Sequence, residues 1–422
     1  METINPAGYL PRVVDAQVQR CLRIYGAVEI SGAKWCGKTW TARHHANSIV
    51  HLDESNALAA AKAAPELVLE GDKPRVIDEW QLAPNVWDAV RHAVDEAAEK
   101  GLWILTGSST PAYSKTRHSG AGRFGRVRMR PMSLFESEDS VGAVSLEGLF
   151  AGKFSPAQTG IDVSTLAELC CRGGWPGVLG FSASDAQQVA RDYLEAALVT
   201  SVPAQGKDSA TARRLLRSLA RNLGQLATYK TLVADMYGQE PGQIAPRTVG
   251  EYLDVLNSLF LIEPVGGWAP PARSPKRFQT KERRYFIDPS LPIVLLRLNE
   301  HSLQRDFQTF GLVFENLCLR DLAVYSEALG ATLRYYRDDA GLEVDAIIET
   351  SSQEWAACEI KLGENKVDKA AKNLVRLREK LLRTPANQVK PPAFLAVITG
   401  LGQYAYQRQD GVYVIPITTL RP

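Results

Sequence analysis

An eight-residue stretch near the start of the chain has the residue types and the spacing of a phosphate-binding loop. Residues 32–39 read GAKWCGKT and fit the pattern G-x-x-x-x-G-K-[ST] at every fixed position. The two glycines allow backbone N–H groups to wrap an anion, Lys38 can reach the outer phosphates, and the Thr39 hydroxyl can ligate magnesium. The predicted nucleotide contacts are Gly32, Ala33, Lys34, Trp35, Cys36, Gly37, Lys38, Thr39 and Trp40.

Two acids follow a short apolar run and supply what hydrolysis of a nucleotide needs. Asp78 and Glu79 end the segment 75–79, which is expected to form a buried strand. Asp78 could then hold the magnesium shell together with Thr39, while Glu79 polarises an attacking water. The alternative is that the two acids cap the following helix, but a phosphate-binding loop upstream favours the catalytic interpretation.

Three further polar residues are candidates for the same site. Ser108 follows the apolar run 102–107, and polar residues that end parallel strands collect at one edge of a sheet. Ser108 could therefore sense the terminal phosphate, although a serine-rich turn fits the spacing equally well. Arg123 or Arg126 could serve as an arginine finger, in cis or to a neighbouring subunit. The next two arginines, Arg128 and Arg130, are better explained as the solvated face of a strand.

The elements that must position these residues are a strand before the loop, at residues 27–30, and a helix after it, at residues 40–46. Taken together, the blocks resemble the AAA-type P-loop ATPases of bacteria and archaea, over roughly residues 9–140. The shared features include an Asp-Glu-x-Gln block at 78–81, the strand end at 105–109 and the Gly122-Arg123 turn. The resemblance implies an α/β fold with a parallel sheet, ATP and Mg²⁺ as cofactors, and a homo-oligomer. In one large branch of the family, the C-terminal half is a domain of unknown function.

Composition limits the class of protein. The chain has 422 residues, 45% of them hydrophobic and 23% charged, which is typical of a globular protein with two or three domains. Its net charge of +2 requires any nucleic-acid contact to come from a local basic patch. No apolar run approaches the roughly 20 residues that span a bilayer, and the first residues lack the features of a signal peptide, so we expect a cytoplasmic protein with no membrane partner. The six cysteines show no disulfide or zinc spacing.

The pattern in the middle of the chain predicts a helical region that could bind DNA. Three expected helices, the last at 248–261, suit a winged helix that would place Arg247 and Tyr252 close to DNA. A winged-helix-like module used for protein contacts fits the pattern as well. The densest basic patch of the chain follows, with aromatic residues interleaved, and predicts contacts to DNA phosphates. Its members are Arg273, Lys276, Arg277, Lys281, Arg283 and Arg284.

The C-terminal third contains a second set of acids, together with a lysine. Its pattern predicts a helix at 310–329, three strands, a helix at 366–381 and a further strand. Asp345 lies in the second strand, while Glu359 and Lys361 project from the same face of the third. Two acids and a lysine can bind a divalent metal, position a water and neutralise a phosphate, and Glu315 could add a carboxylate.

This element order resembles the PD-(D/E)XK nuclease superfamily, and the chain matches its pattern at Asp345, Glu359 and Lys361. It departs at Val344, where the pattern often has proline. Some domains of this superfamily do not cleave and serve as DNA-binding or assembly modules, so cleavage stays open.

Four domains are expected: an AAA-type P-loop ATPase domain at 1–150, a helical bridge at 151–205, a winged-helix-like domain at 206–290 and a restriction-endonuclease-like α/β domain at 291–422. The sequence thus predicts an ATPase whose nucleotide state controls a DNA-binding, nuclease-like C-terminal half. The alternative is a nucleotide-gated protein-interaction or assembly ATPase whose C-terminal domain is catalytically inactive.

Overall fold

The computed structural model describes residues 4, 6–108, 120–238, 244–271, 274, 280–383 and 389–422. The chain divides into two compact units. Unit 1 comprises residues 1–131, 175–177 and 258–261, and unit 2 comprises residues 132–174, 178–257 and 262–422. Residues 132–150, which the sequence assigns to the first domain, therefore group with unit 2. Within the described residues, no helix combines the length and the apolar character that crossing a membrane requires.

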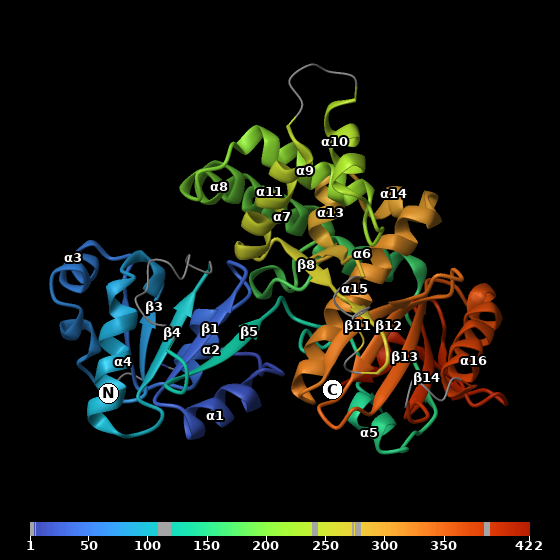
Figure 1. Cartoon of the computed structure of the whole chain (residues 1–422), viewed down its shortest axis with the longest axis horizontal. Helices are drawn as coiled ribbons and strands as arrows, with labels where there is room; N and C mark the ends of the chain where they lie inside the picture. The colour runs from blue at the N-terminus through green and yellow to red at the C-terminus, as the bar shows by residue number, and fades with distance from the viewer. Residues whose placement is uncertain are drawn as a thin grey trace. The chain divides into compact units, whose positions relative to one another are not determined.

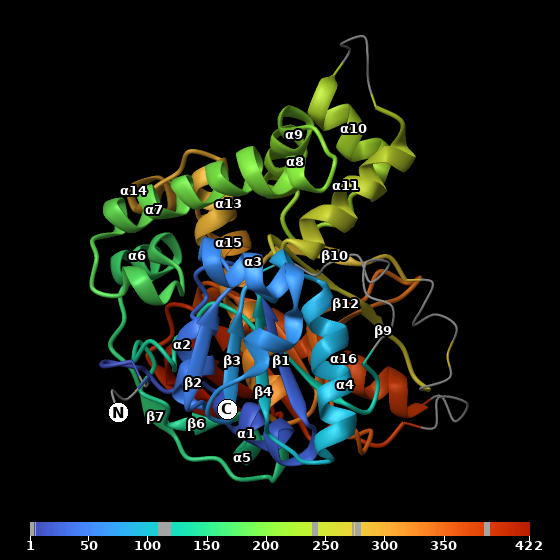
Figure 2. The ribbon, with the colours of Figure 1, turned by 90° about the vertical axis from the view of Figure 1, so that its left-hand side faces the viewer.

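Unit 1 is built on a five-stranded parallel sheet with the strand order β2-β3-β4-β1-β5. Figure 2 shows β2, β3, β4 and β1 side by side. The central strands are almost fully buried, as is usual where helices cover both faces of a parallel sheet. The strands are β1 (Ala27–Gly32), β2 (Ser48–His51), β3 (Arg75–Asp78), β4 (Trp103–Gly107) and β5 (Phe124–Met129).

Helices connect these strands. Aromatic side chains pack in the core between the sheet and helix α4 (Asn85–Ala97). The ring of Trp87 stacks on Phe124 with centroids 3.9 Å apart, and Trp80 packs against Trp87. Because all strands of this sheet are parallel, the carboxyl ends of β1, β2, β3 and β4 lie at the same end of the sheet. The helices are α1 (Asp15–Ile24), α2 (Lys38–His44), α3 (Ser55–Ala63) and α4 (Asn85–Ala97).

The first part of unit 2 is mainly helical and ends in a two-stranded antiparallel sheet of β8 (Ile262–Val265) and β10 (Arg283–Phe286). Three helices followed by a two-stranded sheet is the element order predicted for a winged helix. The helices of this part are α5 (Leu146–Phe150), α6 (Val163–Arg172), α7 (Ala183–Ala196), α8 (Val202–Ala204), α9 (Ser209–Arg221), α10 (Tyr229–Tyr237) and α11 (Pro246–Ser258).

The prediction that Tyr252 faces DNA is wrong. Its side chain is 6% exposed, and its hydroxyl accepts a hydrogen bond of 3.1 Å from the Asp208 backbone N–H. The Lys207 ammonium lies 5.4 Å from the centre of its ring. Tyr252 faces the interior because it lies on the same stripe of α11 as Val249 and Leu256, which are fully buried. Arg247, at the start of this helix, is exposed.

The C-terminal part of unit 2 contains an eight-stranded mixed sheet (Figure 1) with the order β7-β15-β16-β14-β13-β12-β11-β9. Its central strands are β11 (Thr332–Arg337), β12 (Glu343–Glu349), β13 (Trp355–Lys361) and β14 (Phe394–Thr399). Helix α15 (Phe307–Ala328) precedes β11, and α16 (Val367–Arg383) connects β13 to β14, which pair in parallel. The predicted order of a helix, three strands, a helix and a strand is therefore observed.

The other strands extend the same sheet on both sides, and a small separate sheet joins two distant segments. Two short helices lead into α15: α13 (Ser290–Leu295) and α14 (Glu300–Arg305). The outer strands are β7 (Ala157–Gln158), β9 (Gly267–Trp268), β15 (Tyr404–Gln407) and β16 (Tyr413–Pro416), and the separate pair is β6 (Val144–Ser145) with β17 (Leu420–Arg421).

A buried ion triad holds α15 in unit 2. Nη1 of Arg320 lies 2.9 Å from Asp288 Oδ2, and Nη2 lies 2.8 Å from Asp321 Oδ1. The two carboxylates also accept backbone N–H groups, from Gly174 at 2.9 Å and from Leu134 at 3.0 Å. The hydrogen bonds satisfy charges that would otherwise be costly to bury, and they attach two distant segments to one helix.

Candidate functional sites

The P-loop follows β1, and its two glycines are required by its geometry. A Cβ at Gly32 would lie 2.1 Å from the Met129 carbonyl oxygen, and Gly37 has φ = +100°, which favours glycine. Lys38 is buried, and its Nζ donates a hydrogen bond of 2.8 Å to the Ala33 carbonyl. The loop residues Lys34 and Trp35 and the following Trp40 are exposed, whereas Cys36 is fully buried.

Side chains from three strands and the P-loop helix meet at Asp78. Its Oδ1 accepts hydrogen bonds from the hydroxyl of Thr39, at 2.9 Å, and from the hydroxyl of Thr106. Its Oδ2 lies 3.0 Å from Nδ1 of His51, the residue that pairs with Asp78 in the sheet. Hydroxyl and carboxylate oxygens are the ligands that Mg²⁺ prefers, so this donor set fits the ion. No sequence pattern indicated His51 or Thr106 as members of this site.

Glu79 lies next to the two residues that hold its carboxylate. It has φ = +56°, in the left-handed region, so the backbone turns away from the extended path of β3 at this residue. Ser108 Oγ donates to Glu79 Oε2 at 3.1 Å, and Gln81 Nε2 donates both to this carboxylate oxygen and to Ser108 Oγ, the latter at 3.3 Å. Ser108 is 4% exposed and lies beside the acids, as expected for the end of a neighbouring strand. Ser109 lies outside the described residues.

Of the two options for Arg123, action in cis does not fit its position in the sheet. Ala27 at the start of β1 pairs with Phe124, whereas Gly32, at its end, pairs with Met129. Arg123 therefore lies at the amino-terminal end of the strands, about 16 Å from the P-loop at ~3.3 Å per residue. Its Nε is 2.9 Å from Asp95 Oδ1 on α4. A contribution to a neighbouring subunit stays a prediction.

The other three arginines of this segment differ from one another. Arg126 is exposed in mid-strand, with Nε 3.6 Å from Glu29 Oε2. Arg128 is half-buried, with its guanidinium 5.5 Å from the centre of the Phe260 ring. Arg130 is buried, so the interpretation as a solvated strand face is wrong for it.

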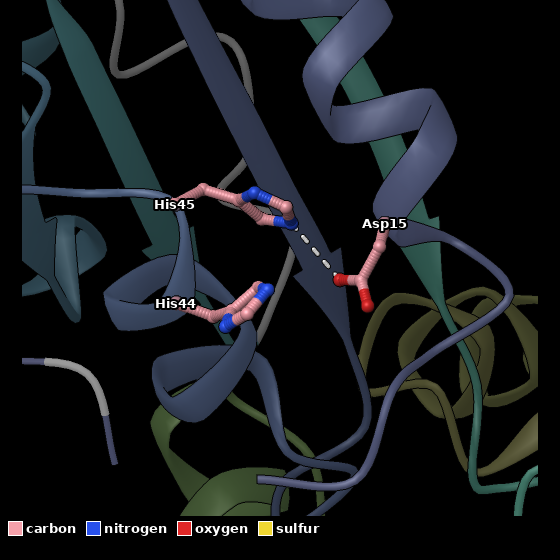
Figure 3. Close-up of side chains that lie close together, drawn as sticks. All are labelled: Asp15, His44 and His45. Atoms are coloured by element: carbon pink, nitrogen blue, oxygen red, sulfur yellow. Dashed lines mark hydrogen bonds and ion pairs between the residues drawn. The ribbon is translucent and has the colours of Figure 1, made fainter.

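No sequence pattern indicated a polar cluster that joins the start of α1 to the end of α2. Asp15, His44 and His45 place their ligating atoms within 4.8 Å of one another, a grouping that could hold a metal ion (Figure 3). However, Asp15 Oδ1 already accepts the Tyr9 hydroxyl at 2.7 Å and lies 2.9 Å from His45 Nε2. Hydrogen bonds therefore account for the positions of Asp15 and His45, while the His44 ring stacks on Tyr9 with centroids 4.4 Å apart. The sequence signal was the histidine pair at the end of the P-loop helix, whose last residue is His44.

The predicted basic patch is only partly described. Arg273, Lys276 and Arg277 lie outside the described residues. Lys281 is exposed, and Arg284 is half-buried, with its guanidinium 5.6 Å from the centre of the Tyr229 ring. The last member of the patch, Arg283, is 6% exposed and faces the carboxylates of the C-terminal site, so its assignment to a DNA surface is wrong. Side chains alternate along β10, and this places neighbouring arginines on opposite faces.

The C-terminal acids and the lysine meet as the sequence predicted. Lys361 Nζ lies 2.9 Å from Asp345 Oδ2 and 2.6 Å from Glu359 Oε2. Burial favours the neutral form of Asp345, but Lys361, the Ile360 backbone N–H and Arg283 outweigh it and lower the pKa of Asp345. Burial, and then the charge of Asp345, raise the pKa of Glu359 to about 7.

Two residues of β10 extend this cluster to α15. Arg283 Nη1 lies 3.8 Å from both Glu315 Oε1 and Asp345 Oδ1, and the Tyr285 hydroxyl donates to Glu315 Oε1 at 2.6 Å. Burial, and then Asp345, raise the pKa of Glu315 to about 7. On the other side, Asn373 of α16 donates to Glu359. No sequence pattern indicated Arg283, Tyr285 or Asn373 as members of this site.

Comparison with known families assigns the N-terminal part. A family model described as an AAA domain matches residues 25–138. Two families described as domains of unknown function, DUF8612 and DUF4143, match residues 163–302 and 310–420. The N-terminal part is therefore a P-loop domain of the AAA type, which supports ATPase function. The family matching the C-terminal third carries no function in its description, so the nuclease-like interpretation stays a prediction.

Two mycobacterial proteins are similar over most of the chain. Uncharacterized proteins of Mycobacterium bovis and Mycobacterium tuberculosis are each 27% identical over 359 residues, which is 81% of this chain and 72% of theirs. Among solved structures, a Walker-type ATPase of Pyrococcus abyssi is similar with a TM-score of 0.43 and 12% identity. The match covers 68% of this chain and 96% of that one, and it is too distant to assign any residue.

Proposed function

We propose that the P-loop site of unit 1 binds ATP with Mg²⁺ and hydrolyses it, and that the nucleotide state controls a nucleic-acid-directed site in unit 2. The observation that carries the first part is the 2.9 Å hydrogen bond between Thr39 Oγ1 and Asp78 Oδ1. It joins the two residues that would hold the ion, one from the P-loop and one from the end of β3.

Each residue of the site has a separate role. Bound Mg²⁺ supplies positive charge to the β- and γ-phosphates, and Thr39 and Asp78 would hold it there. Lys38 binds the outer phosphates, and Glu79 orients the attacking water and accepts its proton. Ser108 fixes the direction of the Glu79 carboxylate through its hydrogen bond of 3.1 Å.

The test is the substitution Glu79→Gln, which keeps the size of the side chain and removes the base. Loss of a general base lowers turnover by about 10²- to 10⁴-fold, and ATP binding is expected to persist. Lys38→Ala is expected to abolish binding. The matched control is Glu96→Gln, at an exposed position of α4, which should leave turnover unchanged. Unchanged turnover in Glu79→Gln would remove Glu79 from its role.

The second part of the proposal concerns the cluster of Asp345, Glu359 and Lys361. Its support is that Lys361 lies within 3 Å of both acids. Their carboxylate oxygens suit a hard divalent cation, and a lysine beside them can neutralise a scissile phosphate. Lys281, Arg284 and the basic residues 273, 276 and 277 are the proposed contacts to DNA.

One observation favours the alternative of an assembly ATPase with an inactive C-terminal domain. Lys361 and Arg283 already neutralise the acids that a metal would need, since Arg283 lies 3.8 Å from both Glu315 and Asp345. Binding of labelled duplex across a salt series separates the two functions, because phosphate contacts are strongest at low salt. No binding at low salt favours the assembly function.

Cleavage is tested separately from DNA binding. Plasmid is incubated with Mg²⁺ or Mn²⁺ and ATP, with Lys361→Ala as the comparison. Nicking by the wild type that Lys361→Ala lacks supports a nuclease, whereas identical behaviour of the two proteins rejects it. Stimulation of ATP hydrolysis by DNA would connect the two units.

A further inference from the structure

The segment from Tyr9 to Asp15, here called the N-terminal clip, contacts the P-loop directly. Nη1 of Arg12 donates a hydrogen bond of 2.7 Å to the Cys36 carbonyl. Nη2 of the same guanidinium donates at 2.8 Å to the carbonyl of Arg130, directly after β5. The Arg12 residue is 7% exposed, so these bonds are shielded from water. One buried charge therefore joins the P-loop to the end of the neighbouring strand.

Asp15 and Tyr9 anchor the clip to the far end of the P-loop helix α2. Asp15 Oδ2 accepts the Arg12 backbone N–H at 2.7 Å, and its Oδ1 lies 2.9 Å from His45 Nε2 (Figure 3). The Tyr9 hydroxyl donates to Asp15 at 2.7 Å and lies 3.0 Å from Thr41 Oγ1. Asp15 of the clip contacts residue 45, after the last residue of α2, and the Arg12 guanidinium contacts residue 36, before its first residue. One segment therefore holds both ends of this helix.

The bond to Cys36 also fixes the orientation of the next N–H group. The peptide between Cys36 and Gly37 is planar and trans, so its C=O and its N–H point in opposite directions. Because Arg12 binds the carbonyl, the Gly37 N–H points away from the Arg12 guanidinium. In a phosphate-binding loop, backbone N–H groups on the inner side are the ones that contact the anion. The φ of +100° at Gly37 makes this turn possible.

We propose that Arg12 is a positioning residue of the ATPase site, whose guanidinium keeps the Gly37 N–H directed at the nucleotide phosphates. This inference rests on the proposed binding of ATP at the P-loop. The second hydrogen bond of Arg12, to the Arg130 carbonyl, connects the P-loop to the end of this part of unit 1. Residue 131, next to Arg130, is the last residue of unit 1 before the chain enters unit 2. Arg12 thus lies between the nucleotide loop and the segment that leads to the C-terminal half.

The test measures the affinity of the full chain for ATP and for inorganic tripolyphosphate, with steady-state KM and kcat. In Arg12→Ala, affinity for both ligands is expected to fall about tenfold to a hundredfold, the effect of losing a hydrogen bond to a charged group. Arg12→Lys keeps the charge but cannot reach both carbonyls, so a smaller loss is expected. Arg20→Ala, at an exposed position of α1, is the matched control and should bind like the wild type.

The comparison of the two ligands separates positioning of the loop from other roles. Equal loss of ATP and tripolyphosphate affinity supports the proposal, because the affected N–H group contacts only phosphate. A loss for ATP alone would place Arg12 at the base or ribose and overturn it, as would unchanged affinity in Arg12→Ala. If Arg12→Ala does not fold, as judged by thermal unfolding without nucleotide, Arg12→Lys decides, and wild-type affinity there overturns the proposal. A wild type that binds neither ligand would instead refute the proposed function.

Discussion

The substitution Glu315→Gln should make unit 2 more stable at pH 8. Glu315 of α15 is half-buried. Partial removal from water, and then the negative charge of Asp345, raise its pKa from 4.5 to about 7. Between these values the folded protein holds a proton that the unfolded chain has released. The free energy of unfolding therefore falls as the pH rises from 4.5 through 7, and above pH 7 the loss is complete. Glutamine keeps the shape, and its carbonyl can still accept the hydroxyl of Tyr285.

The size of the effect follows from the pKa shift. The difference of about 2.5 units, at 1.36 kcal/mol per unit, corresponds to about 3 kcal/mol. Part of this change falls below pH 5, so in Glu315→Gln the difference in unfolding free energy between pH 5 and pH 8 should shrink by about 2.5 kcal/mol. Glu359, whose pKa is also raised to about 7, should keep its own share of the pH dependence.

The assay is urea unfolding at pH 5.0, 6.5 and 8.0 in EDTA, so that no divalent ion binds the carboxylates. The two units can unfold in separate transitions, and the pH dependence of each is compared between proteins. Glu354→Gln, at an exposed turn of unit 2, is the control and should change neither transition. If the pH dependence of both transitions is the same in Glu315→Gln and in the wild type, the assignment of a raised pKa to the Glu315 carboxyl is refuted.

Three other substitutions test other parts of the structure. Thr106→Val removes a hydroxyl that donates to Asp78 and should lower kcat/KM for ATP about tenfold, the effect of one charged hydrogen bond, with little change in the melting temperature. Arg320→Met leaves two buried aspartates without their cation and should lower the free energy of unfolding, measured in urea, by about 3–5 kcal/mol. Gly32→Ala should abolish ATP binding in a direct titration, because its Cβ would lie 2.1 Å from the Met129 carbonyl.

At several positions, sequence patterns did not predict which way a side chain points or at which end of the sheet it lies. Arg123 follows a glycine turn and reads like an arginine finger, but the register of β5 puts it at the edge away from the P-loop. Tyr252 lies in the helix expected to enter a DNA groove and Arg283 in the basic patch, but both side chains face inward. Residue type and spacing do not specify which face of a helix or strand the rest of the chain will cover.

The sequence by itself determined the P-loop, the acids at the end of β3 and the order of elements around Asp345 and Lys361. These features are local, because eight consecutive residues fix the loop and alternation within one strand fixes the face that two residues share. Only the tertiary structure brought Arg12 to Cys36, His51 to Asp78 and Arg283 to Glu315. Each of these contacts joins residues more than 20 positions apart, and it depends on strand order and packing that no short pattern encodes.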